Sequence, residues 1–308
     1  MATAYFSHAD FAGHLTPEGH PERVARMAAV ARGLAGTDLD RREAPLGTEA
    51  DVLRCHPARH LERVRAAVPE AGLAQLDPDT WLSPGSLQAA FRAVGGVCAA
   101  VDLVVSGGAA NAFVGCRPPG HHAETETPMG FCLFGNVAIG AKRALEVHGL
   151  RRVAVVDFDV HHGNGTQDLL WNEARVLFVT SQQMPLWPAT GDVSECGAHG
   201  QVVNVPLPPG SGGAEMQAAY EAMALPRLDA FAPELILISA GFDAHADDPL
   251  AGLCWSEADY AWLTGRICDV ADRHAGGRVV SVLEGGYDLA ALARSVEAHV
   301  GVLRERGA

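Results

Sequence analysis

Residues 153–166 read VAVVDFDVHHGNGT, an apolar run followed by a cluster of acidic and imidazole side chains. Its apolar, β-branched beginning predicts a buried strand of a parallel sheet. Charged side chains do not belong inside such a strand, so the acidic and imidazole residues lie at its carboxyl end, where open α/β sheets bind ligands. Asp157, Asp159 and His161 alternate along an extended backbone, which turns their side chains the same way. Asp159 and His161 therefore form half of a predicted metal site, because burying paired carboxylates without a cation is costly.

A second apolar run, LILISAGF at residues 235–242, also ends in a carboxylate, that of Asp243. Asp159, His161 and Asp243 would form a site of two carboxylates and one imidazole with room for water, and such an open position marks a catalytic metal. Zn²⁺ fits this set, and Fe²⁺, Co²⁺ and Mn²⁺ fit it as well. His245 is a weaker ligand candidate, because it lies beyond the strand end and faces either the cleft or solvent.

A pair of adjacent histidines follows the apolar run at residues 112–114, in the sequence RPPGHHA at residues 117–123. Two prolines and a glycine fix a rigid turn that presents both imidazoles. One histidine of such a pair can act as a base while the other tunes it, and each needs a partner at its far nitrogen to set the tautomer. Asp157 and Asn164 are the candidate partners. Two surface histidines on a loop are the alternative.

The fourth cluster is VVSVLEGGY at residues 279–287, a strand run that ends in Glu284 and two glycines. The glycines let the backbone approach a site closely. Tyr287 could then supply a phenol O–H to a developing oxyanion. Alone, this is a weak signal, for which an ordinary turn with a packed aromatic is the alternative.

Together these motifs resemble the histone deacetylase superfamily in its bacterial class II-like branch, the relatives of histone deacetylase-like amidohydrolases and acetylpolyamine amidohydrolases. They run in family order from near residue 8 to past residue 290, so the resemblance covers essentially the whole chain. The combination is highly specific. The matching pieces are GHPER (19–23), DT (79–80) before SPGS (83–86), RPPGHHA (117–123), GFC (130–132) before Asn136, DFDVHHGNGT (157–166), PLWPATG (185–191), SAGFDAH (239–245) with DPL (248–250), and LEGGYDL (283–289).

The resemblance implies a zinc-dependent deacetylase and a role for each matching residue. The zinc ligands are matched by Asp159, His161 and Asp243. The catalytic set is matched by His121, His122, Asp157, Asn164 and Tyr287. In this set His122 is the general base and Tyr287 polarises the amide carbonyl. Asn164 stands where other branches carry an aspartate, which is typical of class II and leaves His122 less basic.

The resemblance also implies a substrate tunnel and a second ion. Phe131 and Trp187 match the aromatic walls of an acyl-lysine tunnel, with Leu250 at its rim. Gly130 matches a backbone acceptor, and Asp79 matches the mouth residue that orients the substrate backbone. A structural monovalent-cation site, usually for K⁺, is matched by the side chains of Asp157 and Thr180 and the backbone carbonyls of Asp159, His161 and Ser181.

The chain departs from the family pattern at three positions, none of which is a metal ligand or belongs to the acid–base set. Gln182 stands where many relatives have histidine, Gly135 replaces a common asparagine, and Thr180 replaces serine but keeps the hydroxyl. The effect of Gln182 falls on the local hydrogen bonding near the monovalent cation.

Composition indicates a cytoplasmic enzyme. The seven cysteines are odd in number and include no C-x-x-C, which is typical of reduced thiols. The N-terminus lacks a secretory signal, and no apolar run reaches the length of about 18 residues that a membrane span needs. The net charge of −14 argues against direct nucleic-acid binding. It favours solubility, and the steering of cationic substrates is the second explanation.

Strand-like runs alternate with helical runs, which predicts an α/β fold with a mostly parallel central sheet and helices on both faces. The resemblance implies the arginase/deacetylase-like variant of this fold. We expect one domain over residues 1–308, because metal-site residues lie on both sides of the long surface loop predicted at 206–213, which is therefore not a domain boundary. Further strands are predicted at 176–180 and 202–205. Helices are predicted at 21–34, 58–68, 84–106, 137–147, 214–231, 256–274 and 289–303.

The predicted reaction is hydrolysis of an N-acetyl amide, most favourably acetyl-lysine in proteins or peptides, giving acetate and a free amine. The alternative substrates are acetylpolyamines or other small acetylated amines. A remote alternative is a non-catalytic module that binds acyl-lysine. An arginase-type ureohydrolase is the rival enzyme, and it would need a second metal. The expected partner is an acetylated lysine peptide or small acetylated amine, without nucleic acid or membrane. The question of a homo-oligomer stays open.

Overall fold

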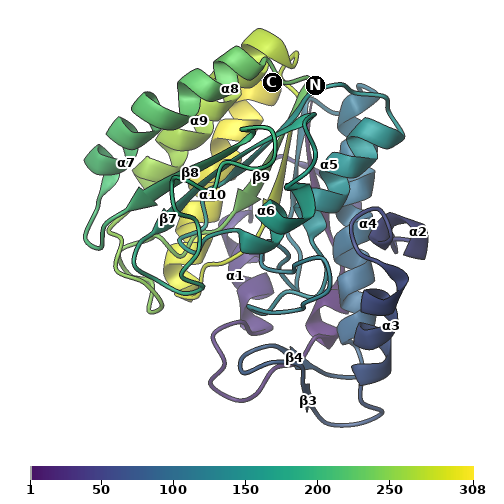
Figure 1. The fold of residues 1–308 in the computed structure, drawn as a ribbon. Coiled ribbons are helices and arrows are strands. Elements are labelled where there is room, and N and C mark those ends of the chain that lie inside the picture. Colours follow the sequence, from purple (N-terminus) through teal and green to yellow (C-terminus); the bar gives the residue numbers. More distant parts are fainter. Residues whose placement is uncertain (1) are drawn as a thin grey trace.

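An eight-stranded sheet forms the centre of the structure, a computed structural model that describes residues 2–308 (Figure 1). The strand order is β2-β1-β5-β10-β9-β6-β7-β8, and every neighbouring pair is parallel. The prediction of a mostly parallel sheet is therefore confirmed. A separate antiparallel hairpin pairs β3 (Ala74–Gln75) with β4 (Trp81–Leu82). The strands of the large sheet are β1 (Thr3–Ser7), β2 (Asp40–Glu43), β5 (Asn111–Val114), β6 (Val153–Asp157), β7 (Val176–Gln183), β8 (Val202–Leu207), β9 (Leu235–Ala240) and β10 (Val279–Leu283).

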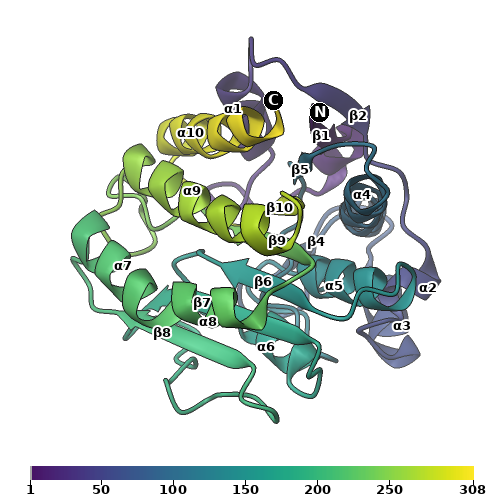
Figure 2. The same cartoon turned by 90° about the horizontal axis from the view of Figure 1, so that it is seen from above.

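Helices cover both faces of this sheet, as the view in Figure 2 shows. Helices α1, α7, α8, α9 and α10 pack on one face, and α4, α5 and α6 pack on the other, with α2 and α3 outside α4. A short 3₁₀ helix, η1 (Ala9–Gly13), follows β1, and a π-helical turn, η2 (Tyr220–Ala224), joins α7 to α8. The α-helices are α1 (Ala25–Gly33), α2 (Glu49–Val52), α3 (Ala58–Ala67), α4 (Ser86–Val105), α5 (Asn136–Glu146), α6 (Asn164–Leu170), α7 (Gly213–Ala219), α8 (Leu225–Phe231), α9 (Glu257–His274) and α10 (Leu289–Gly307).

The central strands are mostly apolar because helices cover both of their faces. Every residue of β6, β9 and β10 is buried. In β6, Val153 and Val155 pack toward α4 and α5, whereas Ala154 and Val156 pack toward α9 and α10. A strand buried in this way needs an unbroken apolar run instead of alternation. Polar side chains are therefore concentrated at and beyond the strand ends.

The register of the strands sets where those polar residues meet. Asp157, the last residue of β6, is aligned with Thr180 on β7 and with Ser239 on β9. Because all three strands run in the same direction, the segments that follow them leave the sheet along one edge. This register brings the loops after β6, β7 and β9 together.

Helix α4 is long and apolar enough to cross a membrane by length and composition, and it is the one such helix within residues 2–308. In this structure 61% of its most apolar window is buried. The helix packs against α5 and the sheet. A buried core helix meets the same criteria, so α4 is weak evidence for a membrane span.

Three predicted helices differ from those observed, one of them being α10, which runs on to Gly307, four residues past its predicted end. Helix α1 begins at Ala25, four residues later than predicted, because the backbone of Glu22 is used elsewhere: its N–H donates to His20 Nδ1 and its carbonyl accepts from Thr16. The helix predicted at 214–231 is interrupted by the π-helical turn η2 before α8. Pro226 lies at the start of α8 and lacks the N–H of a regular helical hydrogen bond, which accounts for the irregular turn.

The strand predictions missed one edge of the sheet and shortened the other. β1 and β2 were not predicted, and β2 reads DRRE and is largely exposed, so it carries no apolar signal. β7 and β8 run on to Gln183 and Leu207, where the two strands still pair. The loop predicted at 206–213 is correspondingly shorter. Pro206 is tolerated because β8 is an edge strand.

Candidate active site

The chain bends sharply after β6, and this bend separates Asp157 from Asp159. Strand pairing stops at Asp157. An Asp157 carboxylate oxygen accepts the N–H of Asp159 at 3.1 Å, and Asp159 Oδ1 accepts the N–H of His161 at 2.9 Å. Such side-chain acceptors favour turns. The predicted extended alternation of the three residues is therefore wrong beyond Asp157, although Asp159 and His161 do face the same point.

Asp159, His161 and Asp243 converge at the carboxyl end of the sheet. His161 Nδ1 lies 3.2 Å from Asp159 Oδ1 and 3.2 Å from Asp243 Oδ2. Asp243 Oδ1 also accepts the N–H of Val160 at 2.9 Å, and Asp159 Oδ2 accepts that of Gly285 at 2.8 Å. These backbone contacts orient the two carboxylates toward the imidazole. Within residues 2–308 this is the one group of at least three His, Cys, Asp or Glu side chains whose ligand atoms all lie within 4.8 Å of one another.

The donor set of this trio fits a divalent cation. The side chains of Asp159 and Asp243 are 1% and 0% exposed, so two negative charges are buried side by side. Burial disfavours a charged imidazole at His161, yet the two carboxylates outweigh burial and raise the pKa of His161 to about 10. The site thus attracts positive charge. An ion among two carboxylate oxygens and an imidazole nitrogen would supply that charge with ligands suited to Zn²⁺ or Fe²⁺.

The histidine pair lies directly beside this trio. The rings of His121 and His122 are 3.9 Å apart, and the ring of His122 lies 5.9 Å from that of His161. His121 Nδ1 is 3.0 Å from an oxygen of Asp157, and His122 Nδ1 is 2.7 Å from Asn164 Oδ1. The structure therefore pairs His121 with Asp157 and His122 with Asn164. Because Asn164 contacts Nδ1 of His122, the other ring nitrogen, Nε2, does not face Asn164.

The two imidazoles have opposite electrostatic surroundings. Burial opposes a charge on His121, but the carboxylates of Asp159 and Asp157 outweigh burial and hold the pKa of His121 well above its usual range. Burial and the neighbouring charges of His121 and His161 hold the pKa of His122 well below its usual range. Because Nδ1 of a neutral His122 donates to the Asn164 oxygen, Nε2 carries the lone pair. His122 is thereby suited to accept a proton.

A cavity of about 240 Å³ leads from the surface to these groups. The predicted walls Phe131 and Trp187, the predicted rim residue Leu250 and the predicted mouth residue Asp79 all border it. Trp187 meets the His122 ring edge-on at 4.7 Å, and Phe131 meets the Tyr287 ring edge-on at 5.9 Å. The lining residues are Pro21, Asp79, His122, Gly130, Phe131, His161, Leu186, Trp187, Leu250 and Tyr287.

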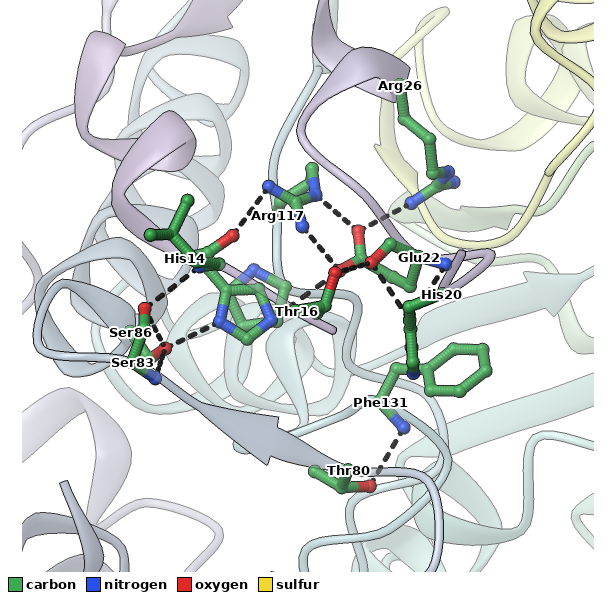
Figure 3. A network of polar contacts seen from close by, with 12 residues as sticks. His14, Thr16, His20, Glu22, Arg26, Thr80, Ser83, Ser86, Arg117 and Phe131 are labelled. Carbon is green, nitrogen blue, oxygen red and sulfur yellow. Dashed lines mark hydrogen bonds and ion pairs between the residues drawn. The ribbon is translucent and has the colours of Figure 1, made fainter. Parts of the chain in front are cut away.

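Gly130 is required here for its lack of a side chain. It has a φ of 57°, and a Cβ at this position would collide with the rings of His122 and Trp187. Phe131, with a φ of 67°, also adopts the left-handed conformation, which costs a bulky residue free energy. Thr80 Oγ1 accepts the Phe131 N–H at 3.0 Å, so the β3–β4 hairpin supports this conformation (Figure 3).

The mouth of the cavity is built from three segments far apart in sequence. The ring of His20 lies 4.8 Å from that of Phe131, and His20 Nε2 donates to the carbonyl of Asp79 at 3.1 Å. Burial, and then the neighbouring Asp77, raise the pKa of Asp79 to about 6. The predicted mouth residue is therefore held by its backbone, while its carboxylate borders the cavity.

Sequence reasoning missed a buried ion network behind the cavity, which Figure 3 shows. The carboxylate of Glu22 contacts the guanidinium groups of both Arg117 and Arg26, and all three side chains are fully buried. Arg26 Nε donates to the carbonyl of Gly286 at 2.7 Å, and its terminal nitrogen donates to that of Glu284. The network thus joins the start of the histidine loop to the loop that carries Tyr287. The sequence signal that could have indicated this network is the presence of charged residues inside the GHPER and RPPGHH motifs.

A second buried carboxylate supports the histidine loop. Glu284 accepts the N–H of Gly120 at 2.6 Å and that of His121 at 3.2 Å, and it also accepts from Ser239. Burial raises the pKa of Glu284 to about 7. The sequence placed Glu284 at the end of a strand without assigning it a role.

The two side chains expected around a monovalent cation lie on neighbouring strands. Asp157 and Thr180 are register partners, and both are fully buried. The Ser181 hydroxyl points away to Tyr220 at 2.8 Å, which leaves its backbone carbonyl as the expected contribution. Gln182 Nε2 donates to the carbonyl of Gly191 at 2.7 Å, so this departure from the family pattern anchors the loop that carries Trp187.

His245 does not join the metal trio. It is 5% exposed, its Nδ1 accepts the N–H of Asp247 at 3.0 Å, and its Nε2 lies 3.3 Å from the Glu257 carboxylate. The prediction that it faces the cleft or solvent is therefore wrong. A carboxylate partner on α9 turns this imidazole away from the cavity.

A parallel α/β sheet that gathers a candidate metal trio, a histidine pair and a tyrosine around one cavity has the architecture of a hydrolase. The histone deacetylase domain matches residues 20–303. The chain therefore belongs to the histone deacetylase family, and it is a histone deacetylase-like hydrolase. The match confirms the resemblance seen in the motifs.

Individual relatives are similar in sequence to nearly the whole chain. A histone deacetylase-like amidohydrolase from Pseudomonas aeruginosa is 41% identical over 280 residues, which cover 90% of this chain and 73% of that protein. A probable deacetylase from Archaeoglobus fulgidus is 36% identical over 298 residues, covering 94% and 82% of the two chains. The crystal structure of the HDA15 HD domain superposes with a TM-score of 0.93 at 32% identity, covering 99% of this chain and 89% of that one.

Proposed function

We propose that this protein is a zinc-dependent deacetylase that removes the acetyl group from acetyl-lysine in proteins or peptides, giving acetate and a free amine. The observation that carries the proposal is the cavity itself. It is bordered by Phe131 and Trp187 and ends at His122, His161 and Tyr287. An extended acyl-amine chain would place its carbonyl beside the metal trio and both proton-handling groups.

Asp159, His161 and Asp243 would hold the zinc ion in this proposal. When bound, such an ion supplies Lewis acidity to the acetyl carbonyl and lowers the pKa of a bound water. The donor set fits Zn²⁺, and Fe²⁺ or Co²⁺ are the alternatives. We further propose K⁺ as the ion at Asp157 and Thr180, with the carbonyls of Asp159, His161 and Ser181.

His122 is the proposed general base. Its Nδ1 faces Asn164 at 2.7 Å, and its low pKa keeps it neutral with a lone pair on Nε2. It therefore can take a proton from the attacking water. The protonated His122 can then give this proton to the leaving amine. His121, held as an imidazolium by Asp159 and Asp157, stabilises the negative charge that develops nearby.

Tyr287 is the proposed donor to the oxyanion. Its ring lines the cavity, and its hydroxyl makes no hydrogen bond within residues 2–308 that would compete with a substrate. Burial holds the pKa of Tyr287 well above its usual range, so the phenol keeps its proton. A positioned donor of this kind typically contributes about 3 kcal/mol to transition-state stabilisation.

The shape of the cavity supports a slender substrate. Two aromatic side chains flank a narrow space, and Leu250 and Pro21 border its outer part. A lysine side chain carrying an acetyl group fits between two rings, whereas a branched or bulky chain does not. The intact pair of His122 and Tyr287 favours a catalyst over a module that only binds acyl-lysine.

Deacetylation of small acetylated amines, including acetylpolyamines, is the second candidate function. The net charge of −14 favours it, because an acidic surface attracts cationic amines. We propose that residues 1–308 act as one deacetylase domain in the cytoplasm. The seven free cysteines support a reducing compartment.

Steady-state kinetics on a matched panel test the proposal. The panel contains an acetyl-lysine peptide, acetylputrescine, acetylspermidine and longer acyl-lysine peptides, each with the Zn²⁺-loaded protein. We expect kcat/KM to be highest for the acetyl-lysine peptide. A value more than about tenfold higher for a polyamine, roughly 1.4 kcal/mol of discrimination, would select the second candidate. No acetate from any substrate would reject both.

A further inference from the structure

A buried carboxylate behind the cavity joins the loop after β9 to the loop after β10. Asp248 is 7% exposed, and one of its oxygens, Oδ2, accepts the backbone N–H of Tyr287 at 2.7 Å and that of Asp288 at 3.3 Å. The other oxygen, Oδ1, accepts the N–H of Leu250 at 3.1 Å. A single side chain therefore fixes the backbone of two residues that border the cavity.

The segment before Tyr287 contains two glycines, so its path depends on contacts from surrounding residues. Gly285 and Gly286 precede it, and Gly286 has a φ of 117°, a conformation open to few residues other than glycine. The carbonyl of Gly286 is held by Arg26 at 2.7 Å. The next backbone group along the chain, the N–H of Tyr287, is held by Asp248. The N–H of Gly285 donates to Asp159 and its carbonyl accepts from Phe242, so the glycines are held upstream and Asp248 supplies the contact at the backbone of the tyrosine itself.

Contacts to the ring and backbone decide where the tyrosine hydroxyl lies. The ring meets Phe131 edge-on at 5.9 Å, and the Arg26 guanidinium lies 5.1 Å from its centre. These contacts restrict sideways movement of the ring. The N–H contact to Asp248 fixes how far the side chain reaches into the cavity. Misplacement of a reacting group by about 1 Å can cost about a hundredfold in rate.

We propose that Asp248 is a positioning residue that acts through Tyr287 and Leu250. Through Tyr287 it sets how far the phenol hydroxyl reaches toward the oxygen of the substrate's acetyl carbonyl. Through Leu250 it sets the position of the cavity rim. This inference rests on the proposed function, in which Tyr287 donates to the oxyanion. Asp248 is not one of the metal trio and does not itself line the cavity, and it contacts the lining only through the backbone N–H groups of Tyr287 and Leu250. Its effect on kcat therefore passes through the tyrosine.

A double-mutant cycle on the Zn²⁺-loaded protein tests this route, with an acetyl-lysine peptide as the substrate. Four proteins are compared: wild type, Asp248→Ala, Tyr287→Phe and the double variant. We expect Asp248→Ala to lower kcat about twentyfold in the wild type but less than about twofold in the Tyr287→Phe background, because the hydroxyl it positions is already gone. A merely structural defect would lower kcat by the same factor in both backgrounds, and that result would overturn the proposal.

The neighbouring Asp247 supplies a matched control. It has the same side chain but is exposed and pairs with Arg294 on α10. Asp247→Ala is expected to leave kcat within about twofold of the wild type in both backgrounds. Zinc content and the thermal unfolding midpoint of every variant are measured, so that loss of metal or of folded protein is recognised.

Asp248→Asn keeps the test open if the alanine variant does not fold. An amide has the same size, and its oxygen can still face the N–H groups of Tyr287 and Asp288, while its NH₂ opposes the N–H of Leu250. We expect kcat within about threefold of the wild type and a KM raised at least about threefold, from the loosened rim. An unchanged KM, or a kcat that falls equally in the Tyr287→Phe background, would overturn the proposal.

The outcomes separate this inference from the proposed function. If Tyr287→Phe by itself leaves kcat unchanged, the proposed role of the tyrosine fails. If Tyr287→Phe lowers kcat and Asp248→Ala does not, the proposed function stands and the inference about Asp248 is wrong.

Discussion

His122 Nδ1 lies 2.7 Å from the amide oxygen of Asn164, whereas His121 Nδ1 faces the carboxylate of Asp157 at 3.0 Å. The two adjacent imidazoles thus have a neutral and a charged partner. This difference separates their pKa values in opposite directions. A pair of titratable groups with divergent environments is the arrangement by which one site provides both a base and an acid.

Replacing Asn164 with Asp should make His122 more basic. A carboxylate opposite Nδ1 stabilises the imidazolium and raises the His122 pKa. Because a general base acts only when it is deprotonated, the acidic limb of the kcat/KM profile should move to higher pH. The pH–rate profiles of wild type and Asn164→Asp, measured with zinc-loaded protein, provide the comparison. An acidic limb that stays in place, or moves to lower pH, would show that His122 is not the base seen in that limb.

Replacing Asp243 with Ala should remove the metal site. The variant keeps Asp159 and His161 but removes the third ligand of the trio, so the remaining two groups no longer surround an ion. We expect lost zinc occupancy by elemental analysis together with lost deacetylase activity. Full activity in this variant would refute the assignment of the site.

Replacing His122 with Ala should act on the transition state more than on substrate binding. We expect kcat to fall by about a hundredfold or more while zinc content stays at the wild-type level, because His122 is not one of the metal trio. The same result is expected for Tyr287→Phe, which removes only the phenol oxygen. Wild-type kcat in either variant would mean that the proposed mechanism is wrong.

Residues at strand ends were predictable from sequence because parallel strands place their carboxyl ends on one edge. Asp157, Asp243 and Glu284 each follow or end an apolar run, and the structure brings all three runs side by side. The partners of the two histidines could be named for the same reason. A buried strand is recognised from its apolar run, and the parallel pairing of such strands places the residues at their carboxyl ends close together.

Contacts between distant loops were beyond sequence reasoning. Arg26 and the carbonyl of Gly286 are 260 residues apart, and Glu22 and Arg117 are 95 residues apart. Nothing in local composition pairs such residues. The polar edge strand β2 was missed because its sequence carries no apolar signal, and the π-helical turn before α8 was missed because one helix was predicted across Pro226.

Replacing Glu22 with Gln should destabilise the protein strongly. The change leaves two buried guanidinium groups without their carboxylate, and breaking a buried ion pair on one side costs about 3–5 kcal/mol. Chemical denaturation of wild type and variant measures the free energy of unfolding.

Glu18 provides the control for this comparison, because it lies in the same segment and is exposed. Glu18→Gln should change the unfolding free energy by less than about 0.5 kcal/mol. A loss below about 1 kcal/mol for Glu22→Gln would show that the arginines find other compensation.

The buried His299 should make the protein less stable as the pH falls. Its ring is fully buried between the hydroxyls of Thr264 and Ser281, at 2.6 and 2.8 Å, and burial lowers the pKa of His299 to about 3. The unfolded chain binds a proton at an ordinary histidine pKa of about 6.5, whereas the folded state does not until about pH 3. The stabilising contribution is therefore complete above about pH 6.5 and is lost progressively below it.

His299→Gln should flatten this pH dependence, because glutamine does not titrate. Between about pH 6 and pH 5, the slope of unfolding free energy against pH should decrease by about 1 kcal/mol per pH unit, the effect of nearly one proton. Denaturant unfolding at a series of pH values measures both slopes, so the test does not depend on how stable the variant is at any one pH. The exposed His199 serves as the control, because its surroundings change little on unfolding, and His199→Gln should leave the slope as it is in the wild type. Equal slopes for wild type and His299→Gln would mean that His299 takes up its proton as readily in the folded protein as in the unfolded chain.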